Sequence, residues 1–321
     1  AAYPEALTWA GLISGPESLD PVPVPFDHPL WVLFSSGTTG KPKGIVHGHG
    51  GALLEQLVLS GFHVGLRDGD VYFWFTSPNW MMWNAQIGGL LVGSTIVLYD
   101  GSPATPTTDA LWRVAEELEV TAFGTSPGYL QLCEREGVEP GTDHDLSRLR
   151  IIGITGSVLP ATGNQWIREH VGAEIQVASL SGGTDIVGIF VASAPTTAVY
   201  DGEISAIALG VSLEVWDDDG KRVPAGTAGE MVITRPMPSM PVMFWNDPDR
   251  SRYRAASASA VTASHNSAFN ASRMATRTKN AASAAGSRAR IDSKKNRSRS
   301  PRRALSWWIT SCRSGARSIA D

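Results

Sequence analysis

Ten residues in the first fifty combine glycine, hydroxyl and lysine side chains, the residue types that suit a phosphate ligand. The string Ser35-Ser36-Gly37-Thr38-Thr39-Gly40-Lys41-Pro42-Lys43-Gly44 contains three glycines, four hydroxyl side chains and two lysines. Glycines let backbone N–H groups turn toward a ligand without a Cβ in the way. Hydroxyls add donors, and the lysines add positive charge. This composition favours the polyphosphate of a nucleotide as the ligand.

The string is not a Walker loop. That motif has four residues between its first glycine and its Gly-Lys-Ser/Thr end. Here two residues separate Gly37 from Gly40, and Pro42 follows Lys41. The alternative to a nucleotide site is an ordinary surface loop of the same composition.

A second string, Ser179-Leu180-Ser181-Gly182-Gly183-Thr184-Asp185-Ile186, follows a predicted buried strand. It is therefore expected at the carboxyl end of that strand, where open α/β sheets bind ligands. The hydroxyl of Thr184 and the carboxylate of Asp185 suit Mg²⁺ beside phosphate oxygens. A Gly/Ser turn with a solvated aspartate is the alternative.

A third string, Gly153-Ile154-Thr155-Gly156-Ser157-Val158-Leu159-Pro160, leads from a predicted strand into a helix. Its small residues would let a flat base lie against the backbone. The alternative is a routine strand-to-helix turn with Pro160 at the first helical position.

The elements that must position these strings alternate along the chain. Strands are expected at 30–34, 71–75, 95–98, 120–123, 149–152 and 174–177, and helices at 51–62, 83–91, 109–118, 127–136 and 160–171. Such alternation predicts an α/β fold, a parallel sheet with helices on its faces. We expect a connecting segment at 1–29, this α/β region at 30–205, and a β-rich subdomain at 206–254 with a hairpin turn at Asp217–Gly220.

The composition limits the classes of protein to which the chain can belong. The chain has 321 residues, of which 42% are hydrophobic and 18% charged, as in globular proteins. No apolar run is long enough to span a bilayer, and no signal peptide is visible. Cys133 and Cys312 make no disulfide framework, and no Cys/His cluster has zinc spacing. We therefore expect a cytoplasmic protein without a membrane partner; its oligomeric state stays open.

The charge is divided unevenly. Residues 250–321 hold sixteen Lys/Arg and two Asp/Glu, a net charge of +14, whereas residues 1–249 carry −18. The Ala/Ser/Arg-rich tail at 255–321 has three interpretations: a nucleic-acid-binding segment with its Arg297-Ser298-Arg299 run, a plain disordered extension, or the product of a GC-rich gene read out of frame. We favour the third, and so do not expect a nucleic-acid partner.

The order of the three strings resembles that of the adenylate-forming (AMP-binding) enzymes, which include acyl-CoA synthetases and luciferases. Within them the chain is most similar to acetoacetyl-CoA synthetases over residues 20–254. The further matching strings are Phe26-Asp27-His28-Pro29-Leu30-Trp31, Lys43-Gly44-Ile45-Val46-His47-Gly48-His49-Gly50-Gly51 and Trp80-Met81-Met82-Trp83-Asn84.

The resemblance implies a fold, a reaction and a set of site residues. The fold is part of the large N-terminal domain of an adenylate-forming enzyme. The reaction joins acetoacetate to CoA with ATP and Mg²⁺, through an acyl-adenylate. Phosphates would be held by Ser36, Thr38, Thr39 and Lys43, within a loop that includes Gly37, Gly40 and Lys41. Adenine would contact Gly156, Ser157 and Val158. Ser181, Gly182 and Gly183 would line the nucleotide, and Thr184 and Asp185 would place Mg²⁺.

The resemblance also implies a substrate pocket. Acetyl-CoA synthetases have a tryptophan at the position matched by Gly182, and glycine would remove that wall and admit a four-carbon acid. Trp80 and Trp83 would line the pocket. The alternative is that Gly182 only supplies a positive φ. His47 and His49 are interpreted as structural, because this chemistry needs no acid–base histidine.

Family-like sequence ends near Arg254, before the expected ribose-binding aspartate and the catalytic lysine of a small mobile C-terminal domain, and the family's long N-terminal stretch is also unmatched. The chain is therefore expected to be truncated at both ends and inactive by itself. Two other functions stay open: a CoA ligase for another short or branched acid, and a nucleotide- or nucleic-acid-binding protein that uses the basic tail.

Overall fold

The computed structural model describes residues 8–15, 20–35 and 43–260. The predicted phosphate-binding residues Ser36, Gly37, Thr38, Thr39, Gly40 and Lys41 lie outside these ranges. Most of the basic tail, residues 261–321, also lies outside them, and with it the prediction that the tail is disordered.

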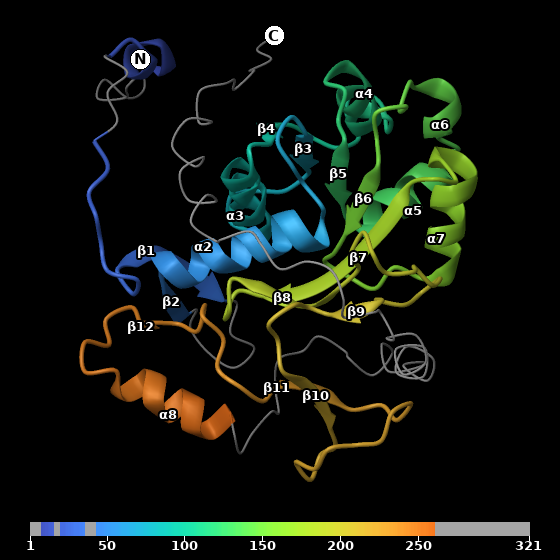
Figure 1. The fold of residues 1–321 in the computed structure, drawn as a ribbon. Helices are drawn as coiled ribbons and strands as arrows, with labels where there is room; N and C mark the ends of the chain where they lie inside the picture. The colour runs from blue at the N-terminus through green and yellow to red at the C-terminus, as the bar shows by residue number, and fades with distance from the viewer. Residues whose placement is uncertain (1–7, 16–19, 36–42, 261–321) are drawn as a thin grey trace, which may run out of the picture.

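Seven strands form the central sheet, in the order β4-β3-β5-β6-β7-β8-β9 (Figure 1). The strands are β3 (Val71–Trp74), β4 (Thr95–Val97), β5 (Ala122–Thr125), β6 (Ile151–Ile154), β7 (Gln176–Gly183), β8 (Gly188–Ala192) and β9 (Ala206–Ile207). The first five strands in this order are parallel, and β8 and β9 are antiparallel to their neighbours. The predicted α/β fold class is confirmed.

Two apolar clusters cover the two faces of the sheet. On one face Phe73, Phe123 and Ile152 pack with α4 (Ala110–Glu117), α5 (Pro127–Arg135) and α7 (Ala161–Trp166). On the other face Tyr72, Ala122 and Ile151 pack with α3 (Met81–Gly88) and the π-helical segment Val58–His63 that continues α2 (His49–Leu57). Neighbouring residues of one strand thus face opposite clusters, as expected for a sheet covered by helices on both faces (Figure 1).

The remaining helical segments are short. They are α1 (Trp9–Ile13), α6 (Pro140–Asp143), the 3₁₀ turn Gly89–Val92 and the π-helical turn Ile167–Val171. In the described part of the chain no helix is both long and apolar enough to cross a membrane.

The strand expected at 30–34 does not join the parallel sheet, which corrects one part of the prediction. It is β1 (Pro29–Ser35) of a separate antiparallel sheet with β2 (Lys43–Gly48) and β12 (Met243–Phe244). The reason is β2, which the sequence analysis missed: it returns directly beside β1, with Ser35 paired to Lys43. The two ends of segment 36–42 are therefore held side by side.

The β-rich part after β9 contains the antiparallel pair β10 (Leu213–Trp216) and β11 (Glu230–Ile233). The predicted turn at Asp217–Gly220 is present, but it leads to a single bridge between Trp216 and Arg222 rather than directly into β11.

Helix α8 (Ser251–Ala260) is a second correction, because no helix was expected beyond residue 250 and residues 255–260 were assigned to the tail. Its first turn is capped by Asp247, which is buried. The carboxylate of Asp247 accepts the backbone N–H groups of Arg252 at 3.1 Å and Tyr253 at 2.8 Å. This cap was missed because a periodicity search looks for apolar residues, not for one buried aspartate.

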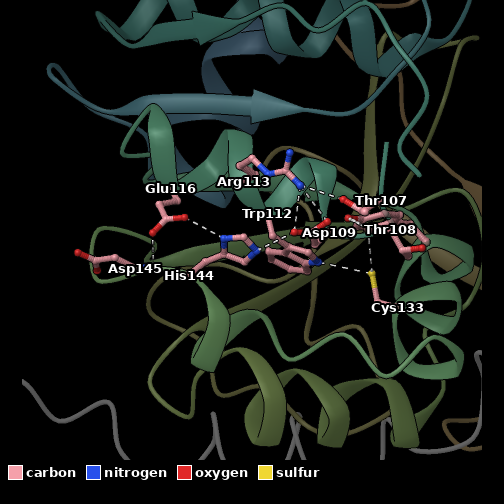
Figure 2. A network of polar contacts seen from close by, with 10 residues as sticks. Thr107, Thr108, Asp109, Trp112, Arg113, Glu116, Cys133, His144 and Asp145 are labelled. Carbon is pink, nitrogen blue, oxygen red and sulfur yellow. Dashed lines mark hydrogen bonds and ion pairs between the residues drawn. The ribbon is translucent and has the colours of Figure 1, made fainter. Parts of the chain in front are cut away.

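A polar network ties α4 to the segment that follows α6 (Figure 2). The imidazole of His144 lies between two carboxylates, with Nδ1 2.8 Å from Glu116 and Nε2 3.4 Å from Asp109. Thr107 and then Arg113 lower the pKa of Asp109. The backbone N–H of Asp145 and then His144 lower the pKa of Glu116.

This network predicts acid sensitivity. Groups with lowered pKa values stabilise the fold at neutral pH, and this contribution is lost as the pH falls below about 4.5 and through the lowered values. Asp109→Asn with Glu116→Gln should reduce stability at pH 6 and flatten the loss of stability between pH 5 and pH 3, measured as urea midpoints. Asp218→Asn with Asp219→Asn, on an exposed turn, is the control. A double variant with the wild-type acid slope would contradict the assignment.

Candidate active site

Two of the three predicted strings lie side by side at one edge of the sheet. Strands β6 and β7 are parallel neighbours, with Ile154 paired to Ser179. The hydroxyl of Thr155, one residue beyond β6, donates to the carbonyl of Leu180 at 2.9 Å. The turn at Gly156 therefore begins beside Leu180 of β7, at the end of the strands where parallel sheets bind ligands.

The turn after β6 requires glycine at its centre. Gly156 has φ of +95°, in the left-handed region, and a Cβ there would lie 3.0 Å from Cη2 of Trp80. The indole of Trp80, which is 39% exposed, thus lies against the turn. Ser157 and Val158 are both exposed. The structure brings together a residue predicted for the acyl pocket and the turn predicted for adenine.

Gly153 in the same string has a different reason to be small. A Cβ on Gly153 would lie 2.5 Å from the indole of Trp74, and one on Gly124 would lie 2.0 Å from it. The indole of Trp74 therefore lies across Gly124 and Gly153 on two neighbouring strands, and Trp74 is 2% exposed. Gly153 packs the sheet and offers no surface to a base.

The second string is mostly strand rather than turn. Strand β7 ends at Gly183, well beyond the expected end at 177, and the turn begins at Thr184. Ser181 is buried, whereas Gly182 is exposed. Three residues here were predicted to line the nucleotide. The side chain of Ser181 is buried in the protein, and Gly182 and Gly183 could contact a nucleotide only through their backbone.

Gly182 is required by the close approach of two strands. A Cβ at this position would lie 2.2 Å from the carbonyl oxygen of Gly188 on β8, next to a bulge in the β7–β8 pair. Gly182 is absent from the positions with positive φ, so the alternative based on backbone conformation is wrong. In this backbone no side chain fits at position 182, and a tryptophan there would displace β8 rather than simply close a pocket.

Thr184 and Asp185 form the polar end of this turn. Asp185 is exposed and Thr184 is half-buried. One carboxylate and one hydroxyl are hard oxygen donors, which fit Mg²⁺ when substrate phosphates supply further oxygens. They would not make a metal site alone, and the described residues contain no group of three or more His, Cys, Asp or Glu side chains placed to bind a metal. The donor set therefore fits a nucleotide-bound Mg²⁺.

A wall of buried polar side chains supports this turn from β2 and α2. His47 Nε2 lies 2.9 Å from the carbonyl oxygen of Thr184, and Gln56 donates to the carbonyl of Val187 at 3.1 Å. Glu55 approaches Gly188 so closely that a Cβ there would lie 2.6 Å from its carboxylate. The sequence analysis took His47 as structural and missed Glu55 and Gln56. Their signal was a Glu-Gln pair in an otherwise apolar helix.

Burial shifts the pKa values in this wall. It lowers the pKa of His47, and the carbonyl of Thr184 opposes that shift only in part. It raises the pKa of Glu55 from 4.5 to about 7, against a smaller opposite effect of the Ser239 hydroxyl. Glu55 is 5% exposed, and with this pKa its carboxyl is protonated below neutral pH and ionises as the pH passes about 7.

Lys43, predicted to hold phosphate, is the first residue of β2. It is exposed, and its ammonium lies 5.7 Å from the ring centroid of Phe244. The structure describes no contact that brings Lys43 to Thr184 or Asp185. Trp83, the other predicted pocket residue, is half-buried in the first turn of α3.

These features define the class of protein. The AMP-binding enzyme family matches residues 3–241, and the chain belongs to it. An acetoacetyl-coenzyme A synthetase of Rhizobium meliloti (strain 1021) is 49% identical over 247 residues, which cover 77% of this chain and 38% of that protein. The acetoacetyl-CoA synthetase of Gallus gallus is 40% identical over 233 residues, covering 73% of this chain and 35% of that protein. The chain thus spans less than two-fifths of these relatives.

Solved structures agree with this class. An acetoacetyl-CoA synthetase from Streptomyces lividans superposes with a TM-score of 0.69 at 52% identity, covering 72% of this chain and 36% of that one. An anthranilate CoA ligase in complex with anthranoyl-AMP superposes with a TM-score of 0.65 at 24% identity, which supports the fold alone. The resemblance to the acetoacetyl-CoA synthetases stated from the sequence is confirmed.

The raised pKa of Glu55 predicts a pH dependence. The unfolded chain ionises Glu55 above pH 4.5 while the folded protein keeps it protonated until about pH 7. Its stabilising contribution is therefore complete below pH 4.5 and lost as the pH rises to 7. The difference in the free energy of unfolding between Glu55→Gln and the wild type should therefore shift in favour of the variant by up to about 3 kcal/mol between pH 4.5 and pH 7.

Urea unfolding of both proteins between pH 4 and pH 8 measures this difference. Glu134→Gln, on the exposed surface of α5, is the control and should follow the wild type. Parallel pH profiles of Glu55→Gln and wild type would show that Glu55 is ionised in the folded protein.

The packing at Gly182 predicts a localised loss of stability. Gly182→Ala should destabilise the protein by about 2 kcal/mol, because the new methyl group meets the backbone of β8. Gly128→Ala in α5 is the matched control, since its Cβ would have only the Ser126 hydroxyl within 4 Å, at 3.8 Å, and its stability should be unchanged or slightly higher. Equal melting temperatures for both variants would mean that β8 can move away.

Proposed function

We propose that this chain carries the adenylating part of an AMP-forming acid–CoA ligase, with acetoacetate as the acid. The observation that supports this best is that the Gly156–Val158 turn begins beside β7, the strand that leads on to Thr184 and Asp185, in a chain that belongs to the AMP-binding enzymes. The identity to two acetoacetyl-CoA synthetases and to a solved one supports the choice of acid.

In the proposed reaction the carboxylate of the acid attacks the α-phosphorus of ATP. The products are an acyl-adenylate and pyrophosphate, and the thiol of CoA then displaces AMP. Such chemistry depends mainly on positioning and on neutralising charge. The edge of the sheet supplies positioning: adenine lies against Gly156, Ser157 and Val158, and the phosphates extend toward Thr184.

Two groups of residues neutralise the charge of the phosphates in this proposal. Ser36, Thr38, Thr39 and Lys43, with the backbone of Gly37 and Gly40 and with Lys41, hold the β- and γ-phosphates. Thr184 and Asp185 hold the Mg²⁺ that neutralises phosphate charge when bound. The exposed carboxylate of Asp185 supports this role, because its donor set fits that ion.

Acetoacetate is proposed to enter beside Gly182, with Trp80 and Trp83 as its apolar lining. One observation supports this placement, and it does not come from Gly182, whose side-chain space is filled by the backbone of β8. The exposed indole of Trp80 lies against the Gly156 turn and so borders the proposed adenylate. A cytoplasmic location, with ATP, CoA and a small acid as partners, completes the proposal.

Binding of a stable acyl-adenylate tests this proposal without requiring turnover. An analogue in which a sulfamate replaces the phosphate should raise the melting temperature of the chain. The acetoacetyl form should bind about tenfold more tightly than the acetyl form, because the added carbon atoms fill the pocket. A butanoyl form separates the effect of size from that of the keto group.

Gly156→Ala should weaken binding of the analogue, since its methyl group would meet Trp80. Gly220→Ala is the matched control: it has φ of +74°, with open space around it, so it carries the backbone strain alone. The proposal fails if no adenylate analogue binds, and its choice of acid fails if the acetyl form binds best.

A further inference from the structure

The turn that carries Thr184 and Asp185 is conformationally strained. Val187 has φ of +50° and is fully buried. A β-branched side chain at positive φ is an outlier that persists only where the surroundings hold it. Within the turn, one long hydrogen bond of 3.3 Å joins Ile186 N–H to the carbonyl of Gly183. The turn therefore depends on contacts from outside itself.

Two buried side chains supply such contacts. The carbonyls of Thr184 and Val187 can only accept hydrogen bonds, so His47 donates through Nε2 and Gln56 through Nε2, at 2.9 Å and 3.1 Å. Both side chains are 1% exposed. The two bonds hold the peptide after Thr184 and the strained peptide at Val187, one on either side of Asp185.

The donors themselves are firmly placed. His47 lies in β2, which is hydrogen-bonded to β1 on one side and to β12 on the other. Gln56 is in the last turn of α2, where a Cβ on Gly88 of α3 would lie 2.6 Å from its side-chain oxygen. The backbone of His47 is thus fixed by two neighbouring strands, and the side chain of Gln56 is packed against α3.

We propose that His47 and Gln56 are positioning residues, which hold the Thr184–Gly188 turn so that the Thr184 hydroxyl and the Asp185 carboxylate face the nucleotide-bound Mg²⁺. This inference deepens the proposed function and rests on it. Neither residue touches substrate. They act through the backbone of the turn, and the metal-dependent part of nucleotide binding is the quantity that they control.

Matched variants separate this role from simple burial. His47→Leu and Gln56→Met remove the donors, and His47→Gln restores a donor at the position of Nε2. His63→Leu is the control for a buried histidine, since His63 bonds the carbonyl of Ser193, directly after the other end of β8. Gln86→Met is the control for a buried glutamine, since Gln86 bonds the carbonyl of Val97.

Two readouts are needed. The first is the gain in ATP affinity on adding Mg²⁺, from calorimetric titrations with and without the ion. This gain should fall about fivefold in His47→Leu and Gln56→Met, return in His47→Gln, and stay at the wild-type value in both controls. The second is amide hydrogen exchange, which should speed up at residues 184–188 in the first two variants and not in the controls.

The two readouts distinguish failure of this inference from failure of the proposed function. Unchanged exchange at residues 184–188 in His47→Leu and Gln56→Met would overturn the inference, as would a normal gain from Mg²⁺ in both. A wild-type protein that binds no ATP would overturn the proposed function, and exchange alone would then decide whether these residues hold the turn.

Discussion

The pairing of β6 with β7 is the constraint on which the candidate site depends. Parallel strands in register run to the same end of the sheet, so the Gly156 turn begins beside Leu180, and β7 continues from there to the Thr184-Asp185 turn. Each strand is fixed by apolar packing on both faces: β6 through Ile152 and Ile151, and β7 through Val177 and Ala178. The core beneath the two strands therefore sets where both loops begin.

Around that pairing, glycine allows close approach in three different ways. Gly156 provides a left-handed turn beside Trp80, Gly153 provides a bare strand surface under Trp74, and Gly182 lets β8 come within reach of β7. Only the first is a conformational requirement, and the other two are requirements of space. The glycine-rich appearance of these strings thus reflects packing of the site's framework as much as contact with a ligand.

The sequence was enough to predict the alternating α/β order, and with it the edge at which Thr184 and Asp185 lie. It was not enough to predict β2, a short strand that begins at Lys43. It was also not enough to predict that β1 pairs antiparallel with β2 instead of joining the parallel sheet. The hydrogen-bond partners of His47 and Gln56 were beyond sequence reasoning for a physical reason. Their partners, Thr184 and Val187, are 137 and 131 residues away along the chain, and a hydrogen bond to a distant carbonyl leaves no local pattern.

The most direct test of the account is the position of a bound adenylate. A crystal structure of this chain with the acetoacetyl sulfamate analogue should show adenine against Gly156–Val158 and the sulfamate beside Thr184, with the acyl group next to Gly182 and Trp80. Binding in the groove between α5 and α7, which Leu130, Leu159 and Trp166 line, would contradict the account. The edge formed by β6 and β7 would then support the fold without binding the adenylate.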